Sequence, residues 1–156
     1  MGLLTAIALG IFVLESQIPA PVPVPGVKLG LANIVTLVTM VLIGKKQAGF
    51  VLAARIVLGS VFAGSPSSLL YSACGGLAAY LAMCLLIDVI GRERIWVTSA
   101  IAAVAHNFGQ LIACALIVKT PGIMAYAPVL AASGIITGVF TGIAAKYLCK
   151  ALEKVI

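Results

Sequence analysis

The sequence predicts an all-α integral membrane protein, built as a bundle of six transmembrane helices. Of its 156 residues, 63% are hydrophobic and only 9% are charged, and the mean hydropathy is +1.24. Soluble domains are about half apolar and about a quarter charged, so this composition indicates a chain buried in lipid. Six apolar runs approach the roughly 20 residues that cross a bilayer. We therefore expect a single transmembrane domain over residues 1–156, with no room for a soluble catalytic domain.

Charges, prolines and glycines separate the runs, and the predicted helices are 2–18, 28–44, 48–64, 68–90, 95–118 and 124–147. The first run lacks the basic start and the small-residue cleavage site of a signal peptide, so we interpret it as a membrane span. Between the first two runs lies loop 19–27, in which prolines alternate with other residues. Alternating prolines favour an extended, polyproline-like path with few N–H donors.

The charged residues between the runs predict the topology. Seven cations fall on one side if six spans alternate, and only two fall on the other; the seven are Lys45, Lys46, Arg92, Arg94, Lys146, Lys150 and Lys154, and the two are Lys28 and Lys119. The positive-inside rule then places both termini in the cytoplasm and the proline-rich loop outside, in a multi-pass protein of the bacterial cell membrane. This distribution also accounts for the net charge of +6, so we expect no nucleic-acid partner.

The fifth run carries the densest group of polar residues. His106, Asn107 and Gln110 fall within about a quarter of the helix circumference, since successive residues are about 100° apart. The interpretation that they only hydrogen-bond neighbouring helices stays open. Three polar groups, one of them an imidazole, are nevertheless more than helix packing usually requires, and they favour a binding site.

Other ionisable residues inside the runs need partners, because a charge in the bilayer core is costly. Arg55 lies about 10 Å along the third run from its cytoplasmic end, at 1.5 Å per residue. Glu15 in the first run is a candidate partner, and a structural ion pair is as consistent with the pattern as a ligand role. Asn33 lies just inside the second run. Lys28 is the first residue of that run, where a lysine side chain can also extend to the membrane interface.

Six of the polar residues lie at a similar depth, at the middle or in the outward half of the predicted bundle. They are Glu15, Lys28, Asn33, His106, Asn107 and Gln110. Asp88 lies instead at the inner end, where we expect an ion pair with Arg92 or Arg94. A polar cluster that opens outward beneath the proline-rich loop predicts a binding pocket with a lid, whereas a rigid connector remains the alternative for the loop. A pore would need polar lining on both sides of the midplane.

Two runs carry stripes of small residues that allow close helix approach. In the sixth run the stripe is Gly134, Gly138 and Gly142, for which packing within the bundle is the favoured interpretation. In the first run it is the weaker series Gly2, Ala6 and Gly10. Glu15 projects about 180° away from Ala6. One face of this helix could therefore meet another protein while the opposite face serves the pocket.

At ESQIP…PGVKLGLANIVTL and AVAHNFGQL the sequence resembles the Gx transporter family, often labelled heptaprenyl diphosphate synthase component I. That family is grouped with the substrate-binding S components of energy-coupling factor (ECF) transporters, and the likeness covers essentially the whole chain. It implies a six-helix bundle of S-component type that captures a ligand from outside. It also implies a transmembrane coupling subunit and ATPase subunits as partners, with Gly2, Ala6 and Gly10 at the contact, although alanine is usual where this chain has glycine.

The residues do not support an enzyme. Asp88 is the single aspartate, so the aspartate-rich motifs of prenyl diphosphate synthases, which hold magnesium, are missing. The sequence has no GxxxxGK[ST] phosphate loop, so we expect no ATP hydrolysis by this chain. Its four cysteines lack metal-binding spacing and are interpreted as small apolar residues. We expect no cofactor and no metal.

The sequence therefore predicts an S component that captures a small anionic or amphiphilic molecule, such as an isoprenoid or quinone precursor, from outside the cell. The expected substrate-binding residues are Glu15, Lys28, Asn33, Arg55, His106, Asn107 and Gln110. A non-catalytic membrane anchor or scaffold for a prenyl diphosphate synthase or redox complex is the main alternative. A small channel is a third, disfavoured because the polar residues lie on one side of the membrane.

Overall fold

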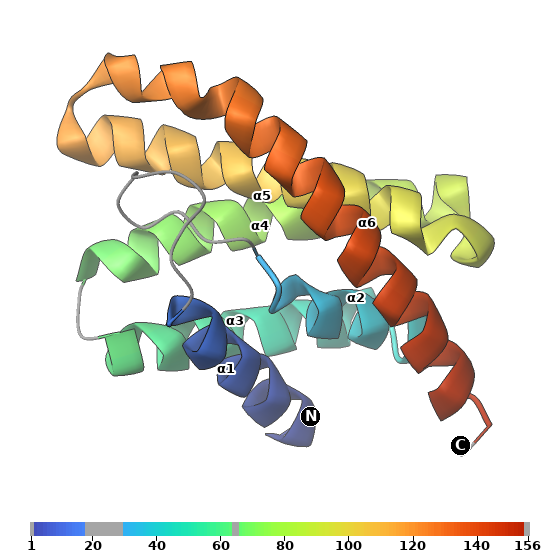
Figure 1. Ribbon diagram of the computed structural model, residues 1–156. Coiled ribbons are helices and arrows are strands. Elements are labelled where there is room, and N and C mark those ends of the chain that lie inside the picture. Colours follow the sequence, from blue (N-terminus) through green and yellow to red (C-terminus); the bar gives the residue numbers. More distant parts are fainter. Residues whose placement is uncertain (1, 18–29, 64–65, 155–156) are drawn as a thin grey trace.

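The computed structural model describes residues 2–17, 30–63 and 66–154, and these residues form helices joined by short turns. Figure 1 shows α5 and α6 as an antiparallel hairpin, with α4 beside α5; α3 packs on α4, α1 packs on α3, and α2 contacts both α3 and α6. The most extensive helix contacts join α5 to α6 and α4 to α5. The predicted proline-rich loop, 19–27, and Lys28 lie outside the described residues.

Six α-helices occur in the described part of the chain: α1 (Gly2–Ser16), α2 (Asn33–Leu42), α3 (Lys45–Ala63), α4 (Pro66–Ile90), α5 (Ile95–Val118) and α6 (Ala127–Leu152). Two 3₁₀ turns, η1 (Arg92–Arg94) and η2 (Pro121–Tyr126), lead into α5 and α6. The all-helical fold and the number of helices are confirmed, and the bounds of α5 are those predicted. Proline near the start of α6 fits a helix beginning, where its missing N–H costs no hydrogen bond.

Four predicted boundaries were wrong by three residues or more. The sixth helix begins at Ala127 rather than at residue 124, because η2 extends to Tyr126, and it ends at Leu152 rather than at residue 147. The second helix begins at Asn33 rather than at residue 28, because Gly30 takes a left-handed backbone conformation (φ 78°) that an α-helix cannot include. The third helix begins three residues early, at Lys45, so the lysine pair 45–46 forms its first turn instead of a loop.

Three helical segments in the described residues are long and apolar enough to cross a membrane: Leu69–Ile90, Arg92–Val118 and Pro121–Leu152. Their outward faces carry large apolar side chains, such as Leu85, Leu116 and Phe140, each at least 70% exposed. Exposed apolar surface of this extent suits lipid contact and supports a membrane protein. The other two apolar helices, α1 and α2, are shorter.

The small-residue stripe of α6 packs against α5, as the favoured interpretation predicted. A Cβ added at Gly138 would lie 2.5 Å from the Cα of Ala100, and one added at Gly142 would lie 2.5 Å from the Cα of Trp96. Both contacts are with backbone, so any side chain at these positions would push the two helices apart. A hydrogen bond of 3.1 Å between the hydroxyls of Ser99 and Thr141 joins the same surfaces.

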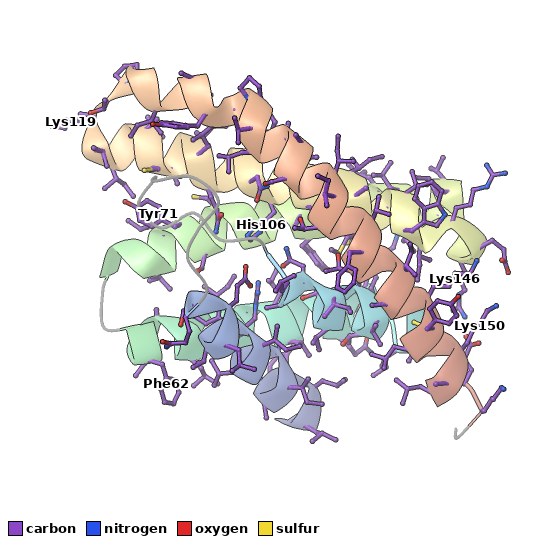
Figure 2. The ribbon with its side chains drawn as sticks, in the orientation of Figure 1. Phe62, Tyr71, His106, Lys119, Lys146 and Lys150 are labelled. Atoms are coloured by element: carbon purple, nitrogen blue, oxygen red, sulfur yellow. The ribbon has the colours of Figure 1, made fainter. Side chains whose placement is uncertain are left out.

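The cations that the sequence assigns to one side gather at one end of the bundle. Lys146 lies 3.4 Å from a carboxylate oxygen of Glu93, and Arg92 lies 3.5 Å from Glu153. Figure 2 shows Lys119 at the opposite end of the α5–α6 hairpin from Lys146 and Lys150.

Asp88 forms its ion pair with Lys45, at 2.5 Å. The predicted pairing of Asp88 with Arg92 or Arg94 was therefore wrong. The reason is that α3 begins early enough to place Lys45 beside the end of α4.

Candidate functional site

Glu15 binds the turn that leads into α2. Its side chain lies near the end of α1, is only 4% exposed, and accepts a hydrogen bond from the backbone N–H of Gly30. The N–H groups of Leu31 and Ala32 also donate to this carboxylate. These N–H groups belong to the turn just before α2, where the partial positive charge at the start of a helix favours a carboxylate. Glu15 thus holds α1 against the start of α2.

Arg55 lies in the middle of α3 and is 3% exposed. Its Nη2 donates to Oδ1 of Asn33 over 3.4 Å, at the long end of the hydrogen-bond range. Glu15 attracts the guanidinium electrostatically. However, no carboxylate comes within 4.0 Å of Arg55 in the part of the chain that the structure describes. The direct ion pair considered from the sequence is therefore replaced by a looser arrangement in which both charges share one buried region.

Two buried donors in this region have no hydrogen-bond partner among the described residues, namely Nε of Arg55 and Nδ2 of Asn33. Buried polar groups in proteins are almost always hydrogen-bonded, so such exceptions mark places where water or a ligand binds. Both groups are donors. A molecule that satisfied them would need to supply acceptors, such as carboxylate, phosphate or carbonyl oxygens.

His106 and Gln110 extend from α5 into the same region, and Figure 2 shows His106 in the interior of the bundle. Two glycines make room for them. A Cβ added at Gly75 of α4 would lie 2.7 Å from Cγ of Gln110 and 2.9 Å from Cε1 of His106. A Cβ added at Gly30 would lie 3.0 Å from Cδ2 of His106. The imidazole is therefore held between α4 and the turn that precedes α2.

These groups surround one small cavity, with lining residues from four helices and the turn before α2: Phe12, Glu15, Gly30, Arg55, Ser72, His106 and Gln110. Its volume is about 10 Å³, close to the space of one water molecule. The structure thus brings together four of the predicted site residues, Glu15, Arg55, His106 and Gln110, and places Asn33 against them through Arg55. It is a closed arrangement, and a larger ligand requires the surrounding elements to separate.

Asn107 is the predicted site residue that points elsewhere. Its Nδ2 donates to the backbone oxygen of Leu130 over 2.8 Å, which ties α5 to α6. Asn107 does not line this cavity, because the 100° between residues 106 and 107 turns their side chains toward different helices. Lys28 lies outside the described residues. The ring of Phe12 covers Gly59 of α3, since it would be 2.8 Å from a Cβ added there.

The sequence interpretation missed several residues of the site. Phe12, Ser72, Gly30 and Gly75 were not singled out, because an apolar ring, a serine and isolated glycines are common in membrane helices. The Gly75–Gly76 pair in the middle of the fourth run was the available signal, since paired glycines allow close approach of neighbouring groups. An added Cβ at Gly76 would lie 3.4 Å from Nη2 of Arg55, so both glycines border the polar region.

The two faces of α1 divide as the sequence predicted. Glu15 and Phe12 face inward and are buried, whereas Gly2, Ala6 and Gly10 are exposed on the outer side. A Cβ added at Gly2 or Gly10 would meet nothing within 4 Å. The stripe is therefore available on the surface of the subunit.

The described residues contain no group of three or more His, Cys, Asp or Glu side chains that could hold a metal ion. The polar region instead combines one carboxylate, one guanidinium, an imidazole and amides, all buried between helices. The fold and this region define the class of the molecule as a helical membrane protein with a buried, mixed-charge polar centre.

The chain belongs to the heptaprenyl diphosphate synthase component I family, whose family model matches residues 4–148. This confirms the family resemblance that the sequence motifs indicated. No curated protein and no solved structure shows significant similarity to the chain.

Proposed function

We propose that this protein is a non-catalytic, substrate-binding S component of an ECF-type importer, which captures a small anionic or amphiphilic molecule from outside the cell. The observation that carries the proposal is the convergence of Glu15, Arg55 and His106, from α1, α3 and α5, on one buried cavity. Charged groups at membrane depth are costly, and in membrane proteins they commonly mark substrate or ion pathways.

The chemistry of the cavity favours a ligand that carries acceptors. Arg55 and Asn33 each present an unsatisfied buried donor, and Glu15 has its acceptors occupied by the N–H groups at the start of α2. A carboxylate or phosphate group of the ligand would complete the hydrogen bonds of Arg55 and Asn33. The remainder of the ligand would contact Phe12, which supports an amphiphilic molecule such as an isoprenoid or quinone precursor.

The volume of about 10 Å³ supports a binding step coupled to a conformational change. The elements that close the cavity are the turn at Gly30 and the end of α1, which Glu15 holds together. Ligand entry would require this contact to loosen. A binding site that closes over its ligand fits a subunit that releases its cargo only after engaging partners.

The partners in this proposal are a transmembrane coupling subunit and ATPase subunits. The exposed stripe Gly2, Ala6 and Gly10 supports a contact on the outer face of α1, since small residues allow another helix to approach closely. The name of the family favours a second candidate, a membrane anchor or scaffold for a prenyl diphosphate synthase.

Purification from native membranes followed by native mass spectrometry tests the proposal. We expect a bound small molecule, together with a coupling subunit and ATPases. Recovery of a prenyl synthase alone, with no ligand on the protein, would support the scaffold instead. A thermal-shift panel of isoprenoid diphosphates and aromatic carboxylic acids complements this, since a ligand at about 100 times its Kd raises the midpoint by about 5–10 °C.

A further inference from the structure

A second hollow lies on the outer face of the α5–α6 hairpin, at its charged end. This groove has a volume of about 530 Å³, and its lining residues come from the start of α5 and the second half of α6: Trp96, Val139, Ile143, Lys146, Tyr147 and Lys150. The five residues of α6 follow helical spacing, so they share one face. Figure 2 shows Lys146 and Lys150 together at this end of the bundle.

The groove changes character along the helix axis. Val139 and Ile143 form its apolar part, nearer the middle of the segment Pro121–Leu152 that is long enough to cross a membrane. Lys146 and Lys150 form its cationic part, near the end of that segment. Trp96 is 41% exposed and Tyr147 is 71% exposed beside the lysines. Tryptophan and tyrosine favour the level of the lipid headgroups, so the groove matches a lipid from acyl chain to headgroup.

The positive charge of the groove is only partly neutralised. Nζ of Lys146 donates to the backbone oxygen of Glu93 over 2.8 Å and lies 3.4 Å from its carboxylate. Lys150 has no hydrogen bond or ion pair within the described ranges of the chain, and Arg92 is the residue paired with Glu153. Lys150 therefore presents an ammonium group that an anion could bind.

We propose that this groove binds an anionic phospholipid from the leaflet at the charged end of the bundle. The phosphate oxygens accept hydrogen bonds from Lys150 and Lys146, and an acyl chain lies along Ile143 and Val139. The apolar part identifies the ligand as a lipid rather than a soluble anion, because it faces hydrocarbon when α6 crosses the membrane. The inference does not depend on the importer function.

Trp96 makes the proposal testable, because it is the single tryptophan of the sequence and lines the groove. The purified protein is reconstituted in nanodiscs of phosphatidylcholine with either brominated phosphatidylglycerol or brominated phosphatidylcholine, and quenching of Trp96 fluorescence is measured. We expect stronger quenching by the anionic lipid at equal mole fraction. Lys150→Gln should weaken this preference about fivefold, since a lysine near an anionic surface contributes about 1 kcal/mol.

Lys46→Gln is the matched control, because it removes an equal charge from α3, outside the groove. Lys150→Gln must also keep the wild-type thermal midpoint, which shows that its groove is intact. The proposal is overturned if both lipids quench equally in the wild type, or if the two variants lose the preference equally, which would indicate general surface charge. Displacement of the lipid by millimolar inorganic phosphate would likewise overturn it, in favour of a soluble anion.

Discussion

Nη2 of Arg55 donates a hydrogen bond to Oδ1 of Asn33 over 3.4 Å, and this contact joins the middle of α3 to the first residue of α2. Its length leaves the guanidinium incompletely satisfied, with Nε lacking a partner among the described residues. Glu15, which lines the same cavity as Arg55, binds the N–H of Gly30. The polar centre thus holds three helices together while retaining donors for a further acceptor.

The first prediction concerns the two opposite charges of this centre. Glu15→Gln and Arg55→Gln should each destabilise the protein, because removal of one charge leaves the other buried without compensation. The double variant should lose less than the sum, with a coupling energy of about 1–3 kcal/mol. The check is the unfolding free energy in detergent, measured for the wild type, the two single variants and the double variant. The losses of unfolding free energy caused by Lys119→Gln and Arg55→Gln should simply add. If the losses caused by Glu15→Gln and Arg55→Gln also added, that result would contradict the account.

The second prediction concerns the glycine that makes room for His106 and Gln110. In Gly75→Ala the new methyl would lie 2.7 Å from Gln110 and 2.9 Å from His106, so both side chains must move. We expect a loss of about 1–3 kcal/mol in unfolding free energy and weaker ligand binding. Gly122→Ala is the matched control, since its Cβ meets nothing within 4 Å. Wild-type stability and binding in Gly75→Ala would show that the imidazole is not confined as described.

The third prediction separates Asn107 from the site. Asn107→Ala should cost about 1–3 kcal/mol of unfolding free energy, because the backbone oxygen of Leu130 loses its side-chain donor. The ligand affinity of the folded protein should stay at the wild-type value, measured by titration well below the unfolding temperature. A large loss of affinity without a loss of stability would return Asn107 to the binding site.

The fourth prediction tests the outer face of α1. Gly10→Leu places a large side chain where an added Cβ has open space, so the isolated subunit should fold and bind ligand as the wild type does. If the small-residue stripe contacts the coupling subunit, the same variant should fail to co-purify with it. Val13→Ala, on the exposed part of the same helix, serves as control. Normal co-purification of Gly10→Leu would remove α1 from the proposed interface.

Local sequence patterns were sufficient to predict an all-helical fold with six helices. Long apolar runs and charged turns predicted six helices, and the glycine stripe of α6 predicted close packing within the bundle, because both signals are local. The structure identifies α5 as the helix on which this stripe packs. Depth along each run also placed Glu15, His106 and Gln110 at the middle or in the outward half of the bundle, and all three line one cavity. Charge distribution grouped the cations that now lie at one end of the bundle.

The pairing of individual side chains could not be predicted in the same way. Whether Asn107 or His106 faces the cavity depends on a rotation of 100° and on which helix lies beside each face, and that is a tertiary property. The binding of Glu15 to the N–H groups before α2 depends on the left-handed backbone of Gly30, which sequence periodicity does not reveal. For the same reason Phe12, which covers Gly59, was indistinguishable from any other apolar residue.

The most direct test of the central claim is equilibrium binding of the co-purifying molecule, identified by its mass, to the wild type and to Arg55→Gln. A hydrogen bond to a charged group contributes about 1.5–3 kcal/mol, so we predict that Kd rises about tenfold or more in this variant, and that Lys119→Gln leaves it unchanged. A folded Arg55→Gln protein that binds with the wild-type Kd would show that the buried polar centre only holds the helices together.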